Sequence, residues 1–191
     1  MIVDDARVSD ETLIGRIAAG DPSAFDRLVR RHQAAVYRFA RAAAPASPPG
    51  DTGDAVEILR ETFLAARRAA PRHRDETSAR PWLLSLARQM IDRRHPRSRE
   101  ADPTPLRELA RAAGWQSGVD GALDDGGLPV ATAFAALPPE DREILTLCDR
   151  EYFTVDEAAR VTGLSDSAVR TRLHRARLRL LARLKEGAEG G

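Results

Sequence analysis

Cysteine and aromatic residues are scarce in this chain of 191 residues. A single cysteine, Cys148, excludes an internal disulfide and every zinc site that needs several cysteines, and it fits a reducing compartment. No stretch approaches the roughly 18 apolar residues of a membrane span, and the first residues lack the basic-then-apolar order of a signal peptide. We therefore expect a cytoplasmic protein that does not insert into a membrane.

Motifs that carry chemistry are also lacking. The sequence has no phosphate-binding loop of glycines and lysine and no paired metal-ligand motif, and no motif joins a nucleophile to a base. Its four histidines are scattered along the chain. We expect no enzyme, no bound metal and no cofactor.

Helical periodicity is the strongest positive signal. Aromatic residues make up only 5% of the chain, whereas alanine, leucine, arginine and glutamate recur at three- and four-residue spacing, which predicts an all-α fold. Asp21 and Pro22 are typical of a helix start, and Pro71 and Pro96 mark breaks. The pattern predicts two small helical bundles joined by a flexible linker. Their ranges are residues 10–95 for the first bundle, 96–136 for the linker and 137–185 for the second bundle.

Charge is balanced overall but uneven along the chain. The net charge is +1, yet residues 67–100 carry 10 basic and 4 acidic groups, and the last 24 residues carry 7 and 2. Each basic patch lies toward the end of a predicted bundle. Two such patches on separate small bundles indicate two contacts with one polyanion.

The most specific motif lies near the carboxyl end. Thr154 and Glu157 have capping-box spacing, which predicts a helix start. Ala159, Gly163 and Val169 then have the spacing of a helix-turn-helix: a small residue where two helices cross, a glycine in the turn, and a branched residue that packs the second helix.

The second helix of this motif has two distinct faces. Val169, Leu173, Ala176 and Leu180 recur at intervals of four, three and four, and predict one buried stripe. Polar side chains on the opposite side, in the half that normally enters the DNA major groove, are expected to read bases. They are Ser167, Arg170, Thr171, His174 and Arg175.

These segments resemble a known family. Residues 137–177 resemble region 4 of extracytoplasmic-function (ECF) sigma factors, bacterial initiation subunits of RNA polymerase in the sigma-70 family. Residues 54–63 are similar to the acidic helix of their region 2, and residues 81–88 to its tryptophan-leucine helix. The resemblance covers roughly residues 10–95 and 135–185 in the family's order.

The resemblance implies a promoter-specificity subunit with RNA polymerase core and promoter DNA as partners. The predicted base-reading residues would recognise the minus-35 element, and region 4 would meet the β flap. Contacts to the β′ clamp would come from Asp54, Glu57, Ile58, Arg60, Glu61 and Phe63. The melted strand of the minus-10 element would be held by Arg67, Arg68, Arg72, Arg74, Arg88, Arg93 and Arg94. The family also implies sequestration by an anti-sigma factor.

Three positions depart from the family pattern and leave alternatives open. Val56 stands where the family usually has an acid, Arg60 where it usually has glutamine, and Tyr152 where it commonly has glycine. One alternative is a helix-turn-helix regulator that acts without core polymerase, although no heptad or spare apolar helix supplies the dimer interface it needs. The other is a helical adaptor that has lost DNA binding.

Overall fold

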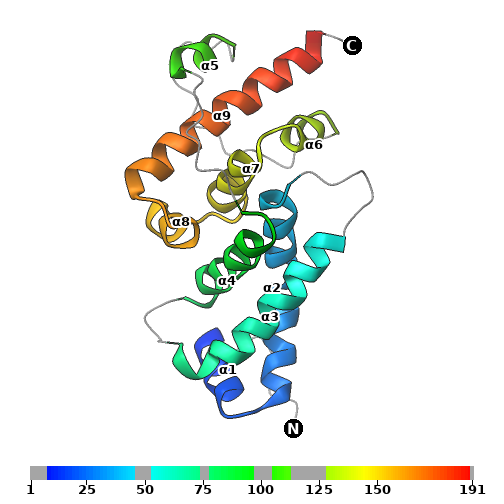
Figure 1. Ribbon diagram of the computed structural model, residues 1–191, viewed down its shortest axis with the longest axis vertical. Helices are drawn as coiled ribbons and strands as arrows, with labels where there is room; N and C mark the ends of the chain where they lie inside the picture. The colour runs from blue at the N-terminus through cyan, green and yellow to red at the C-terminus, as the bar shows by residue number, and fades with distance from the viewer. Residues whose placement is uncertain (1–7, 46–52, 74–77, 97–104, 113–127, 190–191) are drawn as a thin grey trace.

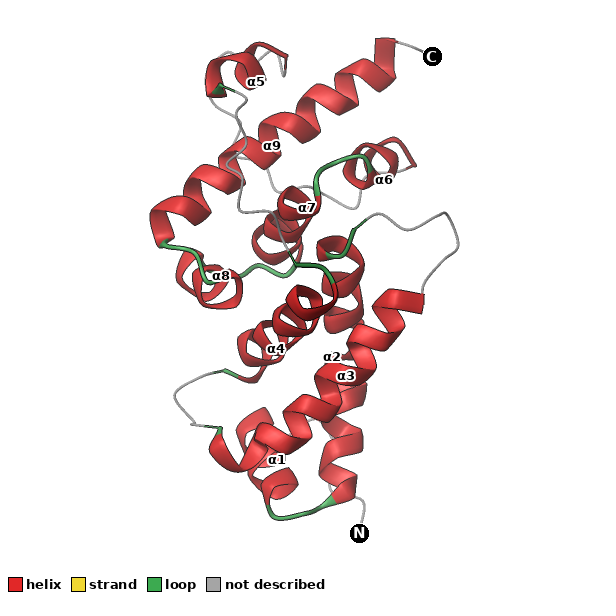
Figure 2. Cartoon of the chain, in the orientation of Figure 1, coloured by secondary structure: helices red, strands yellow, loops and turns green. Residues whose placement is uncertain are grey.

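The structure is all-helical in the part of the chain it describes. The computed structural model describes residues 8–45, 53–73, 78–96, 105–112 and 128–189, and every regular element within these ranges is a helix or helical turn (Figure 2). No helix within these ranges combines the length and apolar character needed to cross a membrane. The helices form two bundles, one above the other in Figure 1, which confirms the predicted fold class.

The first bundle forms the lower half of the molecule in Figure 1. Its elements are α1 (Asp10–Ala18), α2 (Pro22–Ala43), α3 (Gly53–Ala69), the 3-10 turn η1 (Ala70–Arg72) and α4 (Ala79–Arg94). Large apolar side chains at helical spacing fill its centre, because each helix turns one apolar stripe inward. They include Leu13, Leu28, Phe39, Ile58, Leu83, Leu84 and Ile91, all at most 1% exposed.

The start of α2 follows the sequence signal. The Asp21 carboxylate accepts hydrogen bonds from the backbone N–H of Ser23 at 2.8 Å and of Ala24 at 3.3 Å, and Pro22 occupies the first helical position. Hydrogen bonds from the Ser23 hydroxyl and from Arg16 lower the pKa of Asp21 to about 2. The cap is therefore ionised at neutral pH, as the helix dipole favours.

The second bundle begins earlier than the sequence pattern indicates. Its elements are α6 (Leu128–Ala135), α7 (Pro139–Leu145), the π-helical turn η2 (Thr146–Arg150), α8 (Val155–Thr162) and α9 (Asp166–Glu189). Helix α6 lies within the segment predicted as a linker, yet it packs on α9 and buries Ala133. The short helix α5 (Leu106–Ala112) also packs on α9, through Leu109 and Leu178.

The two bundles pack against each other. Helix α4 lies on α8, and the carboxyl half of α2 lies beside α7 and η2 (Figure 1). A single apolar cluster continues from the first bundle into the second. The sequence pattern of two bundles on a linker did not predict this shared core.

Arg142 of α7 joins the bundles through backbone carbonyls. Its guanidinium is buried and donates to Ala42 O at 2.9 Å and Ala44 O at 2.5 Å, at the end of α2. It also donates to Leu137 O at 2.8 Å and Ala135 O at 3.3 Å in its own bundle. Carbonyls at a helix end lack partners within the helix, so one side chain satisfies the end of α2 and fixes α7 against it.

Replacing Arg142 by alanine should lower the free energy of unfolding by about 2 to 4 kcal/mol, because buried carbonyls lose a charged donor. Urea unfolding followed by circular dichroism measures this. Arg30→Ala is the matched control, since Arg30 is exposed, and should change stability by less than about 0.5 kcal/mol. An equal small effect for both variants would contradict the role assigned to Arg142.

Candidate nucleic-acid interface

Helices α8 and α9 form the predicted helix-turn-helix. Thr154 caps α8: its hydroxyl accepts from Glu157 N at 3.3 Å, and the Glu157 carboxylate accepts from Thr154 N at 2.9 Å. Gly163 ends α8 with φ of 71° and donates its N–H to Ala159 O at 2.8 Å. The capping box and the glycine turn are both confirmed.

Tyr152, in the loop before α8, has a backbone conformation that favours glycine. Its φ is 55°, and its side chain is 77% exposed between the buried residues Glu151 and Phe153. An aromatic residue is uncommon in this left-handed region. The turn lets Glu151 and Phe153 both lie inward while Tyr152 lies outside. A tyrosine at this position therefore still adopts the backbone conformation that glycine would take freely.

Helix α9 presents the two predicted faces. Val169, Ala176 and Leu180 are fully buried and Leu173 is half-buried, which confirms the apolar stripe. Ser165 caps the helix, accepting from Ala168 N at 3.3 Å. Because the stripe packs inward, the first three turns of α9 carry a polar face on the other side.

That polar face contains all five predicted base-reading residues. Ser167, Arg170 and Thr171 are exposed, whereas His174 and Arg175 are half-buried. Arg170 lies 4.0 Å from Asp166 with two thirds of its side chain exposed, so this contact holds it only weakly. The face has the polarity and basic charge of a major-groove surface.

Further along α9, arginines fix the helix to its own bundle. Arg177 binds Asp149 of η2 at 2.6 Å, and Arg179 binds Asp141 of α7 at 2.5 Å. Both carboxylates are buried. These pairs hold the middle of α9 to its own bundle, so that the first turns of the helix are presented on a rigid support.

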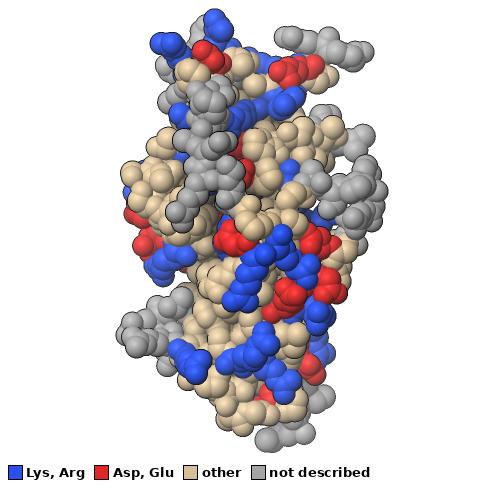
Figure 3. Space-filling view, in the orientation of Figure 1, with Lys and Arg blue, Asp and Glu red and all other residues tan. Residues whose placement is uncertain are grey.

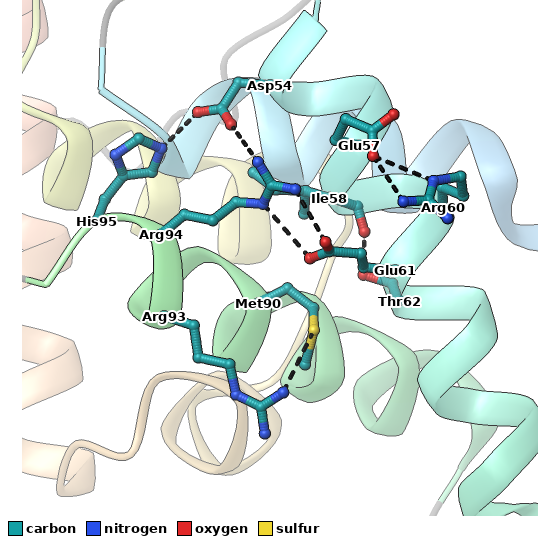
Figure 4. Close-up of polar contacts among 10 residues, drawn as sticks. All are labelled: Asp54, Glu57, Ile58, Arg60, Glu61, Thr62, Met90, Arg93, Arg94 and His95. Atoms are coloured by element: carbon teal, nitrogen blue, oxygen red, sulfur yellow. Dashed lines mark hydrogen bonds and ion pairs between the residues drawn. The ribbon is translucent and has the colours of Figure 1, made fainter.

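The predicted polymerase face on α3 is linked to the end of α4 (Figure 4). Arg94 donates to Asp54 at 3.2 Å and to Glu61 at 2.9 Å, and His95 bonds the other oxygen of Asp54. The hydrogen bond from Arg94 lowers the pKa of Glu61 and raises the pKa of Arg94. Arg94, predicted to contact DNA, is thus paired with Asp54 and Glu61, which are predicted to contact polymerase.

The same face is only partly as expected. Glu57 and Arg60 are exposed enough to meet a partner and pair with each other at 2.8 Å. Ile58 and Phe63 lie in the core at 0% and 4% exposure, so the expectation that they contact a partner is wrong for this arrangement. A stretch of helix offers only one side to a partner, and these two side chains belong to the other side.

The arginines predicted for the minus-10 element do not form one patch. Arg67, Arg68 and Arg72 are exposed near the end of α3, where arginines show in the lower half of Figure 3. Arg93 and Arg94 end α4, and Arg94 bonds Asp54 at the start of α3. The rise of a helix places this end of α3 about 20 Å from Arg67. Arg74 lies outside the described residues.

Arg88 is buried rather than facing solvent. It is 5% exposed and pairs with Glu143 of the second bundle at 3.1 Å and with Asp92. The expected exposure of Arg88 is therefore corrected: α7 covers it. Trp82 is half-buried at the edge of the core and contacts His73, with ring centroids 4.4 Å apart and the ring planes tilted by 44°.

The sequence pattern missed the charged contacts between the bundles. Arg38 and Arg80 both bind Glu151, whose partners lie 113 and 71 residues away along the chain. Their only sequence signal is an acidic stretch, residues 137–167, that follows the basic stretch 67–100.

Comparison with known families gives two matches in the order of the bundles. Residues 28–100 match the family described as Sigma-70 region 2, and residues 128–180 match Sigma-70, region 4. The second range begins at α6, in agreement with the packing of that helix on α9.

Curated relatives are similar over most of the chain. It is 31% identical over 172 residues to the ECF RNA polymerase sigma factor SigM of Mycobacterium tuberculosis, spanning 90% of this chain and 83% of that protein. It is 32% identical over 187 residues to the ECF RNA polymerase sigma factor SigC of the same species, spanning 93% and 94%.

Solved structures share the fold. CnrH, in complex with the cytosolic domain of CnrY, aligns with a TM-score of 0.60 and 28% identity over 90% of this chain and 94% of that one. The sigma factor RpoE of Bartonella quintana, in complex with the anti-sigma factor NepR, aligns with a TM-score of 0.60 and 19% identity over 84% and 96%. The second likeness concerns the fold alone.

Replacing Thr154 by alanine should lower the free energy of unfolding by about 1 kcal/mol, because α8 loses its cap. Thr154→Ser keeps the hydroxyl and should lose no more than a few tenths of that amount. Chemical denaturation of both variants tests the cap. Equal losses for alanine and serine would show that the hydroxyl does not stabilise the motif.

Proposed function

The chain belongs to the ECF RNA polymerase sigma factors of the sigma-70 family, and we propose that it directs transcription initiation as a promoter-specificity subunit. In this role it binds RNA polymerase core, recognises the minus-35 and minus-10 elements and holds the melted strand. It acts in the cytoplasm and carries out no chemistry of its own.

The polar face of α9 is the observation that carries this proposal. It combines three exposed groups, Ser167, Arg170 and Thr171, on a helix that follows a capped turn. Arginine can bond both O6 and N7 of guanine, and threonine can meet a thymine methyl group. The base-reading half of α9 thus has the chemistry to read a duplex, with Arg175 and His174 completing the face.

Polymerase binding fits the acidic side of α3. Asp54, Glu57 and Glu61 are acidic side chains at the surface of one helix, and Val56 lies 45% exposed beside them. Acidic groups of this kind can meet a partner surface of opposite charge. Arg60, in place of the family's glutamine, can pair with a carboxylate of the clamp.

An anti-sigma factor is the regulator that this function implies. CnrH, which is similar to this chain, is in complex with a second protein, the cytosolic domain of CnrY. We infer a protein of this class for the present chain, covering its polymerase-binding and DNA-binding faces.

Reconstitution with polymerase core tests the proposal. The protein, core enzyme and a library of promoter fragments containing bubbles should yield transcripts from a specific subset. A helix-turn-helix regulator would bind duplex DNA and give no transcripts with core. An adaptor would do neither, and either result would overturn the proposal.

Within the minus-35 interface, Arg170→Ala should cost about 1 to 3 kcal/mol of discrimination at one base pair. Arg183→Ala should weaken binding evenly across sequences, because Arg183 lies beyond the base-reading half and pairs with Glu186 at 3.5 Å. Binding of the holoenzyme to a set of single-base promoter variants measures both. Equal, sequence-independent losses would contradict the assignment of the α9 face.

A further inference from the structure

Glu151 is a fully buried carboxylate in the loop before the helix-turn-helix. Its side chain is 0% exposed, and both of its oxygens are bonded by arginines of the other bundle. Arg38 of α2 approaches one oxygen with Nε at 2.8 Å and Nη2 at 2.6 Å, and Arg80 of α4 binds the other. A carboxylate can be buried in this way only when opposite charges accompany it.

The two arginines converge on one point but remain reachable from solvent. Their side chains are 37% and 40% exposed, and the guanidinium of Arg80 also lies 5.4 Å from the centre of the Phe153 ring. Burial lowers the pKa of Arg80, and so does the positive charge of Arg38, which agrees with their closeness. Two positive charges that both contact one carboxylate favour an anion between them.

We propose that Arg38 and Arg80 form an anion site of the first bundle that takes a backbone phosphate of the bound promoter strand, and that Glu151 occupies this site when the bundles are packed together. Closure of the two bundles and strand binding at this site then exclude each other. The identity of the polyanion rests on the proposed function, whereas the site itself rests on the contacts of Glu151.

Phosphate matches the site in charge and geometry. Guanidinium groups bind carboxylate and phosphate through the same pair of parallel N–H groups, so one anion can replace the other. In the packed arrangement the carboxylate takes up donors that a nucleic-acid backbone would otherwise use. Arg80 lies in the first turn of α4, the helix whose arginines the family resemblance assigns to the melted strand, so the site lies on an element expected to meet that strand.

A second contact repeats the pattern. Arg88, predicted to face phosphate, is covered and paired with Glu143 of α7. Residues 137–167 carry 3 basic and 8 acidic groups, and this part of the second bundle packs on α4, within the basic stretch 67–100. Two arginines of the basic stretch, Arg80 and Arg88, therefore pair with carboxylates of the acidic stretch.

The contact of Glu151 with Arg38 and Arg80 is tested first, on the free, full-length protein. Glu151→Gln keeps the size of the side chain but removes its charge and replaces one acceptor oxygen by an NH2 donor, and Glu151→Ala removes the group. Both should enlarge the radius of gyration measured by small-angle X-ray scattering, while circular dichroism keeps the helical signal. Asp156→Asn is the control: it removes the same charge from the same bundle, but Asp156 pairs with Arg160 on its own helix.

The anion site is tested next with a fluorescent DNA duplex containing an unpaired stretch, without polymerase. Glu151→Gln should bind this probe about tenfold more tightly than the wild type and the Asp156→Asn control. Adding Arg38→Ala and Arg80→Ala to the Glu151→Gln variant should abolish the gain. It should also reduce the slope of log affinity against log salt by about one to two, the loss of one or two phosphate contacts.

Two results would overturn the proposal. If Glu151→Gln and Glu151→Ala both stay as compact as the wild type, Glu151 does not hold the two bundles together. If the chain opens but loss of both arginines changes neither probe affinity nor salt slope, the site does not take phosphate. Neither the radius of gyration nor probe binding requires transcription. If the wild-type protein fails to direct core polymerase, the proposed function is rejected, but the two measurements still test the role of Glu151.

Discussion

Charged groups buried between the two bundles must be paired, and the arrangement of the molecule depends on this constraint. Glu143 and Glu151 from the second bundle, and Arg88 from the first, are each at most 5% exposed. Removing such charges from water is costly unless the partner is present with good geometry. Each bundle therefore supplies what the other requires: arginines from α2 and α4, carboxylates from α7 and the loop before α8.

The same constraint makes the packed state conditional. The apolar part of the interface favours contact without regard to partner charge, but Glu151 and Glu143 add a requirement for arginines at defined positions. A ligand that claims those arginines removes the compensation for the buried carboxylates. The interface thus combines a hydrophobic contact with buried ion pairs, which require oppositely charged partners at defined positions.

Local signals in the sequence predicted what depends on a few neighbouring residues. Thr154 and Gly163 gave the start and end of α8, and Asp21 the start of α2, because caps and turns are decided within about four residues. Contacts across a hundred residues, such as Arg142 with Ala42, leave no such local trace. The segment that becomes α6 was predicted as linker because residues 96–136 as a whole mix proline, glycine and acid at low apolar density. Ile58 was assigned to a binding face by family position alone, although its apolar spacing in α3 already favoured the core.

Helix α9 is held firmly to its bundle and still exposes an arginine, because the arginines along its length make different contacts. Arg177 and Arg179 bind buried carboxylates of their own bundle, so the middle of α9 cannot move without breaking ion pairs. Arg170, about two turns before them, has only a weak contact with Asp166 and keeps most of its side chain exposed. An arginine that must find a base edge needs its donors available, whereas its helix needs a fixed direction. Placing paired arginines after the available one meets both needs within a single element, and the capped turn at Gly163 then orients that element against α8.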